Sequence, residues 1–276
     1  MGVRRAVDMA LEAAAANNIV YTLGPLIHNK KVLDGLKSKG IGILAEGEKP
    51  SPASTVIIRA HGVAPLTEKE FAVQGINIID ATCPNVKANQ KRAYEFAQRG
   101  YKVFLAGEKD HGEIIGIKGY AEGPADSSCY VIADPEEAES AGEELSRVDP
   151  AAKTVLLGQT TLSRNEYNAI GEKIKKYFPG TEIINTICGA VSERQESLME
   201  LAGLVDAVIV AGSRDSANTR RLFYLARELG KPAWLMETGE DLPFGINKYR
   251  TIGLAAGASA PDSLIDEIEE ALYNSK

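Results

Sequence analysis

Two distant stretches of this chain have nearly the same pattern, and this internal repeat constrains the fold more than any other feature. Residues 78–86 read IIDATCPNV, and residues 183–191 read IINTICGAV. Each stretch begins with a short β-branched run, which predicts a buried strand. Each then places a cysteine, Cys83 or Cys188, where a segment of helical periodicity begins. The repeat therefore predicts duplicated strand–helix units.

Apolar runs alternate with helical segments along the whole chain, so the sequence predicts an α/β fold with mostly parallel sheets covered by helices. Eleven strands are predicted, at residues 19–23, 41–44, 56–59, 76–80, 101–106, 130–133, 154–158, 182–186, 207–212, 233–236 and 251–255. Grouped by the cysteine repeat, they predict three pseudo-repeated lobes around a central site, at residues 1–75, 76–180 and 181–276. The third lobe ends in a C-terminal helix.

The start of the chain looks like a third copy of the helix that follows each cysteine. Val3 occupies the place of Val86 and Val191, so the register puts a third cysteine directly before Met1, outside this sequence. By the same grouping, the first lobe lacks its opening strand.

The segment at residues 123–152 is rich in Glu, Asp, Ser and Pro around one short strand, and it reads as a solvated insertion. Cys129 lies in this segment and outside the repeat. We interpret it as a structural cysteine, because free cysteine is often simply buried.

Composition narrows the functional class. The chain has 276 residues, is 44% hydrophobic and has a formal net charge of −7, which argues against a nucleic-acid surface. No apolar stretch approaches the roughly 20 residues of a membrane span. Three cysteines without a secretory signal fit reduced thiols or metal ligands better than disulfides. We therefore expect a soluble, cytoplasmic protein without a nucleic-acid or membrane partner.

Polar side chains gather in the loops that follow equivalent strands of the three lobes, where parallel sheets bind ligands. All three histidines of the chain lie in these loops. The candidate binding residues are His28, His61, His111, Thr160, Ser216, Asn218 and Ser259, with the acid Glu113. Taken singly, the serines, Asn218 and Thr160 are equally consistent with helix capping.

Together these residues predict an anion site, with a diphosphate as its natural occupant, because helix N-termini supply N–H groups and positive dipole ends. No Walker loop or GxGxxG fingerprint occurs, so a nucleotide is not indicated. Cys83 and Cys188 would point to the same centre. The chain has no CxxC pair typical of structural zinc, and single thiolates from repeated units suit an iron-sulfur cluster better.

These motifs resemble the 4-hydroxy-3-methylbut-2-enyl diphosphate reductase family, the LytB-type last enzyme of the non-mevalonate isoprenoid pathway. The resemblance covers essentially the whole chain. It is carried by segments 2–6, 27–29, 60–63, 80–84, 111–113, 159–163, 185–188, 212–218 and 256–262.

The resemblance implies a three-lobed fold around a 4Fe-4S cluster held by three cysteines, and a two-electron reductive removal of the allylic hydroxyl of the substrate. The products would be isopentenyl and dimethylallyl diphosphate, and a ferredoxin or flavodoxin would supply the electrons. Cys83 and Cys188 match cluster ligands, Glu113 matches the proton-delivering acid, and Thr160 matches its neighbour at the substrate hydroxyl. The substrate-binding set, mostly on the diphosphate, is matched by His28, His61, His111, Ser216, Asn218 and Ser259.

Two departures from the family pattern stand out. Ala217 takes the place of a common second serine, and the first cluster cysteine is absent from the sequence. Either the native polypeptide begins upstream of Met1, or this is a shortened form that cannot hold a normal cluster; the otherwise intact architecture favours the first account. The alternative functions are a cluster-free diphosphate-binding protein and another three-lobed iron-sulfur enzyme, such as a quinolinate synthase-like dehydratase.

Overall fold

The computed structural model describes residues 2–16, 19–27, 29–45, 47–123 and 128–275. The chain forms two compact units, one of residues 1–26 and 36–187 and the other of residues 27–35 and 188–276. Among the described residues the first unit holds two parallel sheets and the second unit holds one, each accompanied by helices as predicted. All eleven predicted strands are present, with ends that shift by one residue or a few. None of the helices in the described ranges is long and apolar enough to cross a membrane.

The first sheet has four parallel strands in the order β2-β1-β3-β4. Its strands are β1 (Val20–Leu23), β2 (Ile41–Leu44), β3 (Thr55–Ile58) and β4 (Asn77–Asp80), and the helices α1 (Gly2–Ala15) and α3 (Pro65–Val73) belong to the same unit. Helix α2 (Lys30–Ser38) begins with residues of the second unit and ends with residues of the first. Strand β3 is buried along its whole length and lies in the middle of the sheet.

Strand β4 corrects the predicted lobe boundaries. It pairs in parallel with β3, from Thr55 opposite Asn77 to Ile58 opposite Asp80, so it closes the first sheet instead of opening the second. In the same way β8 (Glu182–Ile183) pairs with β7 (Thr154–Gly158) in the second sheet. The prediction that the first sheet lacks a strand is therefore wrong. Sequence pattern identifies a strand, but its partners are set by contacts between distant residues.

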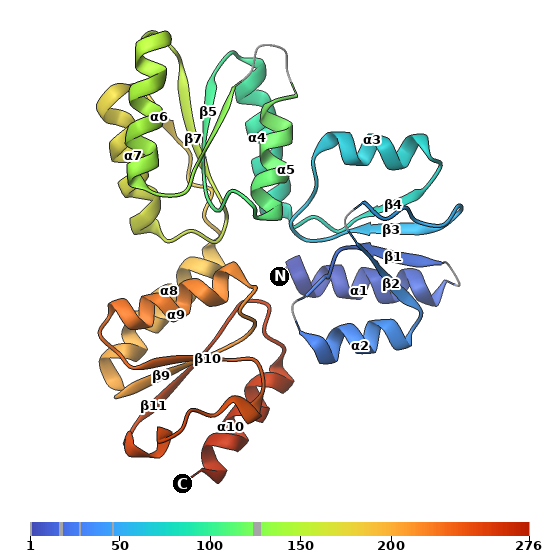
Figure 1. The fold of residues 1–276 in the computed structure, drawn as a ribbon, viewed down its shortest axis with the longest axis vertical. Helices are drawn as coiled ribbons and strands as arrows, with labels where there is room; N and C mark the ends of the chain where they lie inside the picture. The colour runs from blue at the N-terminus through green and yellow to red at the C-terminus, as the bar shows by residue number, and fades with distance from the viewer. Residues whose placement is uncertain (1, 17–18, 28, 46, 124–127, 276) are drawn as a thin grey trace. The chain divides into compact units, whose positions relative to one another are not determined.

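The second sheet has the order β6-β5-β7-β8 and is covered on both faces. Its remaining elements are β5 (Lys102–Ala106), β6 (Cys129–Ile132), α4 (Pro84–Gln98), α5 (Gly112–Ala121), α6 (Pro135–Val148) and α7 (Arg164–Tyr177). In Figure 1, α6 and α7 lie on one side of β5 and β7, and α4 and α5 lie on the other. A separate apolar cluster fills each face, one around Phe104 and Leu156 and the other around Leu105 and Leu157.

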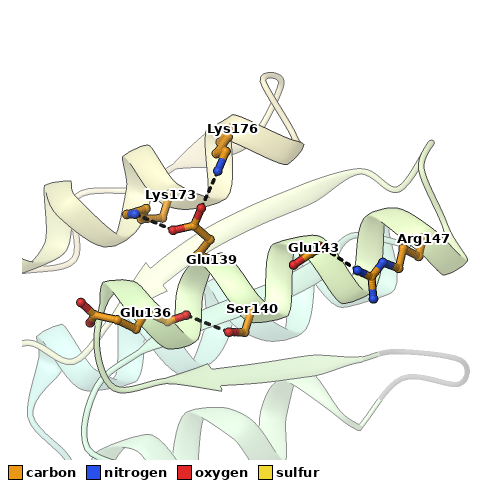
Figure 2. Close-up of polar contacts among 7 residues, drawn as sticks. All are labelled: Glu136, Glu139, Ser140, Glu143, Arg147, Lys173 and Lys176. Carbon is orange, nitrogen blue, oxygen red and sulfur yellow. Dashed lines mark hydrogen bonds and ion pairs between the residues drawn. The ribbon is translucent and has the colours of Figure 1, made fainter.

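Helix α6 lies in the acidic segment at residues 123–152 that is predicted to be a solvated insertion, and the structure corrects this prediction for the helix. Its Ala138 and Leu145 are buried in the core of the second sheet. Its acidic residues lie on the other face, where Glu139 binds both Lys173 and Lys176 of α7 (Figure 2). These two hydrogen bonds lower the pKa of Glu139 to about 2. The charged composition therefore reflects one exposed face of an amphipathic helix.

The third sheet belongs to the second unit and has the order β10-β9-β11 within the described residues. Its elements are α8 (Gly189–Leu204), β9 (Ala207–Ala211), α9 (Ala217–Glu228), β10 (Ala233–Met236), β11 (Ile252–Ala256), α10 (Asp262–Asn274) and the short 3-10 turns Gly239–Asp241 and Ile246–Lys248. Helices α8 and α9 pack on one face through Leu198 and Leu222, and α10 packs on the other through Leu264 and Ile268.

The three sheets share one local plan, which agrees with the sequence repeat. The central strands β1, β5 and β9 are each followed directly by a glycine, Gly24, Gly107 and Gly212, whose φ angles are 77°, 153° and 140°. Each glycine adopts a left-handed conformation that other residues avoid, and the chain then turns into a loop that leads to a helix. The loops that carry the candidate site residues therefore start from the same structural point in each sheet.

Candidate functional site

The N-terminus of α5 carries two of the predicted site residues in a fixed geometry. His111 is the N-cap of this helix, and its Nδ1 accepts a hydrogen bond from the Glu113 backbone N–H at 3.2 Å. A ring nitrogen that accepts carries no proton, so in the neutral imidazole the proton lies on Nε2. His111 therefore offers an Nε2–H donor to a neighbouring group.

Glu113 is held in place by the loop that follows β7. Its side chain is 1% exposed. Oε1 accepts a hydrogen bond from the Thr160 backbone N–H at 2.7 Å, and Oε2 accepts one from Thr160 Oγ1 at 2.9 Å. Buried carboxylates are rare unless they are hydrogen-bonded in this way. The structure thus joins the two residues that the sequence resemblance placed at the substrate hydroxyl.

His61 lies beside His111, although the two residues follow strands of different sheets. Their ring centroids are 4.8 Å apart, with a T-shaped arrangement. The next residue, Gly62, packs against Thr82 of the cysteine loop, since a Cβ on Gly62 would lie 3.1 Å from Thr82 Cγ2. The first unit therefore brings together His61, His111, Glu113 and Thr160 around the N-terminus of α5.

Cys83 is the N-cap of α4, as the repeat predicts, and it faces the start of α1. A Cβ on Gly2 would lie 3.0 Å from Cys83 Sγ. The loop before Cys83 is held by Asp80, whose Oδ1 accepts a hydrogen bond from the Thr82 backbone N–H at 2.9 Å. Arg5 also donates to the Thr82 carbonyl oxygen at 3.0 Å. The sequence analysis did not identify this positioning role of Asp80.

The second unit repeats this design. Cys188 is the N-cap of α8, and Ser216 is the N-cap of α9, where its Oγ accepts a hydrogen bond from the Thr219 backbone N–H. Asn218 is 4% exposed, and its Oδ1 and Nδ2 have no hydrogen-bond partner among the described residues. Buried polar atoms normally have a partner, so this side chain is suited to a bound ligand. Ala217 is the first residue of α9 and is also buried.

A cavity of about 240 Å³ lies in the second unit beside the third sheet. Ser259 and Ser213 line it, and they come from the loops that follow β11 and β9. Asn29 lines it as well, and Asn29 Oδ1 caps α2 by accepting from the Val32 backbone N–H at 3.0 Å. The other lining residues are Lys30, Gly212, Glu237, Thr238, Ala260, Pro261 and Leu264.

The predicted residues thus fall into two groups, one in each unit, and the convergence of both groups on one cavity stays a prediction. His28 lies outside the described residues. The sequence analysis also missed Arg59, which directly precedes the Ala60-His61-Gly62 motif, and Gln159, which directly precedes Thr160. Proximity to those motifs was the one available signal for both residues.

Cys83 and Cys188 have the chemistry that the iron-sulfur prediction requires, but they are two where the family pattern implies three cysteines. Cys83 and Cys188 each begin a helix, where the positive end of the dipole favours anionic ligands. In the described ranges, however, the His, Cys, Asp and Glu side chains form no group of three or more that could hold a metal ion. Cys129 lies in β6, where burial raises the pKa of its thiol to about 12, which agrees with a structural role.

Comparisons with known proteins agree with the resemblance. The chain is 42% identical over 279 residues to 4-hydroxy-3-methylbut-2-enyl diphosphate reductase of Treponema denticola, with 98% of this chain and 94% of the relative covered. It is 38% identical to the enzyme of the same name from Aquifex aeolicus, over 97% of this chain and 90% of the relative.

Solved structures give the same result. The structure of the E-1-hydroxy-2-methyl-but-2-enyl-4-diphosphate reductase from Plasmodium falciparum matches with a TM-score of 0.90 and 28% identity, covering 99% of this chain and 84% of that one. A structure described as (E)-4-hydroxy-3-methyl-but-2-enyl diphosphate reductase, the terminal enzyme of the non-mevalonate pathway, matches with a TM-score of 0.71, 36% identity, and coverage of 99% and 95%. The model of the LytB protein family matches residues 1–273, and this chain therefore belongs to the LytB family.

Proposed function

We propose that this chain is a 4-hydroxy-3-methylbut-2-enyl diphosphate reductase, an oxidoreductase of isoprenoid biosynthesis. Membership of the LytB family along the whole chain supports this proposal, together with relatives of that name at 34–42% identity. The observation that carries the site assignment is the buried Glu113 carboxylate bound twice by Thr160.

The reaction removes the allylic hydroxyl of the substrate as water. The C–O bond breaks and a C–H bond forms, and the substrate consumes two electrons and two protons to give isopentenyl or dimethylallyl diphosphate. Glu113 is the proposed donor of the proton that converts the leaving hydroxyl into water, because a positioned acid lowers the barrier to departure of a poor leaving group. Thr160 holds both carboxyl oxygens, so it fixes the direction in which Glu113 presents its proton.

Cys83 and Cys188 are the proposed ligands of a 4Fe-4S cluster. When bound, such a cluster would pass on the two electrons one at a time and would supply a Lewis-acidic iron for the hydroxyl oxygen. A ferredoxin or flavodoxin is the proposed electron donor. The described residues provide two of the three cysteines that the family pattern implies, so cluster binding needs its own measurement.

The diphosphate is the proposed ligand of His28, His61, His111, Ser216, Asn218 and Ser259. The Nε2–H of His111 and the unpartnered amide of Asn218 are donors suited to a diphosphate oxygen. Helix N-termini at both residues add favourable dipole ends.

The proposal is tested by anaerobic reconstitution of the protein with iron and sulfide. We expect bound iron and visible iron-sulfur absorbance, and turnover of the allylic diphosphate when reduced ferredoxin or flavodoxin is supplied. Cys83→Ser and Cys188→Ser should lose bound iron, and Cys129→Ser is the matched control that should keep it. A protein that binds the diphosphate but stays colourless would instead support a cluster-free binder. Preference for a dicarboxylate over the diphosphate would support the quinolinate synthase-like alternative.

A further inference from the structure

Arg59 occupies a structural position that recurs in the first and second sheets. It lies one residue past the end of β3, as Gln159 lies one residue past the end of β7. Gln159 is fully buried, and its Oε1 accepts from the Glu108 backbone N–H at 3.0 Å while its Nε2 donates to Thr161 Oγ1 at 2.9 Å. In the second sheet this position is therefore filled by a neutral amide whose hydrogen bonds are made within the protein.

The guanidinium of Arg59 fills the same position in the first sheet without such partners. It lies against Gly24, the left-handed glycine that directly follows β1, since a Cβ there would lie 2.9 Å from Arg59 Nη1. Over the part of the chain that the structure describes, its side chain makes no hydrogen bond and no ion pair. Arg59 is half-buried, and burial lowers the pKa of its guanidinium, but arginine remains charged at neutral pH. A partly buried charge without a partner is unfavourable.

The other end of the guanidinium lies against the N-terminus of α5. A Cβ on Gly112, the first residue of that helix, would lie 3.2 Å from Arg59 Nη2 and 3.5 Å from His61 Cβ. Because a helix N-terminus carries partial positive charge, a cation there is electrostatically unfavourable. His61 and His111 add two imidazoles to the same place and no negative charge. The one buried acid nearby, Glu113, is already bound by Thr160.

We propose that Arg59 is a specificity residue for anionic substrates, whose missing counter-charge is the diphosphate bound at the His61 and His111 end of the site. This inference rests on the proposed function, and it adds the residue that gives the diphosphate site a permanent positive charge. Histidines, serines and asparagine supply directional donors, but a guanidinium keeps its charge at any physiological pH. Arg59 accordingly favours a diphosphate over a neutral alcohol of the same carbon skeleton.

The test measures binding of inorganic pyrophosphate to the whole protein by calorimetry, which requires no turnover. Arg59→Gln replaces the charge with the residue that fills the equivalent position of the second sheet. Arg59→Lys keeps the charge, Arg59→Met keeps the aliphatic packing, and Arg147→Gln removes one exposed arginine charge on α6 as the matched control. We expect Arg59→Gln and Arg59→Met to weaken binding at least ~10-fold at ~50 mM salt and by much less at ~500 mM, because salt screens charge. Arg59→Lys and Arg147→Gln should stay within about threefold of the wild type.

A second measurement separates this role from a structural one. If Arg59 is an uncompensated cation, Arg59→Gln should melt at the same temperature as the ligand-free wild type or higher, and pyrophosphate should raise its melting temperature less. The inference is overturned if Arg59→Gln binds pyrophosphate like the wild type, or if neither uncharged variant folds. If the wild type turns over the allylic diphosphate and Arg59→Gln binds pyrophosphate as tightly as the wild type, this inference is refuted and the proposed function is not. Wild-type protein that binds no pyrophosphate refutes both the inference and the proposed function.

Discussion

Replacement of Glu113 by glutamine separates its chemical role from its structural one. In the wild type the two carboxyl oxygens accept from the Thr160 backbone N–H and Oγ1–H. A glutamine side chain can accept the backbone N–H with Oε1 and donate Nε2–H to Thr160 Oγ1, because a hydroxyl both donates and accepts. Both contacts therefore survive in Glu113→Gln, and we expect it to lose no more than about 1 kcal/mol of unfolding free energy.

Alanine at the same position gives the contrasting result. Glu113→Ala removes both acceptors and leaves the Thr160 N–H and hydroxyl buried without their carboxylate partner, which lowers the unfolding free energy by about 1–3 kcal/mol. The cavity left by the missing side chain lowers it further. The total loss should be roughly 2–4 kcal/mol. Denaturant unfolding of both variants tests these values.

Glu113→Gln should lower the catalytic rate far more than it lowers the stability of the fold. Loss of a positioned general acid lowers a rate by about 10²–10⁴, which corresponds to roughly 3–5 kcal/mol of barrier. We expect Glu113→Gln to show this fall in kcat with KM for the diphosphate changed little, measured on reconstituted protein with matched iron content. The control is Glu143→Gln, which alters an exposed carboxylate on α6 that pairs with Arg147. A kcat of Glu113→Gln within about threefold of the wild type would refute the acid role.

Two further predictions concern the cysteine loop and the structural cysteine. Burial raises the pKa of Asp80, but hydrogen bonds from Lys87 and Thr82 outweigh it and lower the pKa overall. A lowered carboxyl pKa stabilises the fold above the unfolded-state pKa near ~4, and this contribution is lost as pH falls through the folded-state value. The stability advantage of wild type over Asp80→Asn should therefore be constant above pH ~5 and shrink in acid, and equal stability at neutral pH would contradict it. Cys129, with a pKa of about 12, should resist alkylation by iodoacetamide at pH ~8, where only about one thiol in 10⁴ is ionised; labelling of Cys129 as fast as a free thiol in a short peptide would contradict this.

Features that depend on neighbours in the chain followed from the sequence. The eleven strands and the helix starts at Cys83 and Cys188 could be predicted, because β-branched runs, helical periodicity and helix-starting positions are local patterns. The candidate residues Glu113 and Thr160 came from the resemblance. Nothing in the sequence alone indicated that both carboxyl oxygens would be bound by one threonine.

The tertiary structure decided what depends on contacts between distant residues. It assigned β4 to the first sheet and β8 to the second, because strand pairing is a choice among edges that local pattern does not distinguish. It showed that an acidic segment contains a helix that covers the second sheet. Composition alone did not reveal this, because it averages the buried and the exposed face of the helix. It placed Arg59 between Gly24 and Gly112, where it is a half-buried cation without a partner among the described residues. The sequence determines which residue types exist, but only folding fixes which charges are left without a partner, because that depends on every group brought near them.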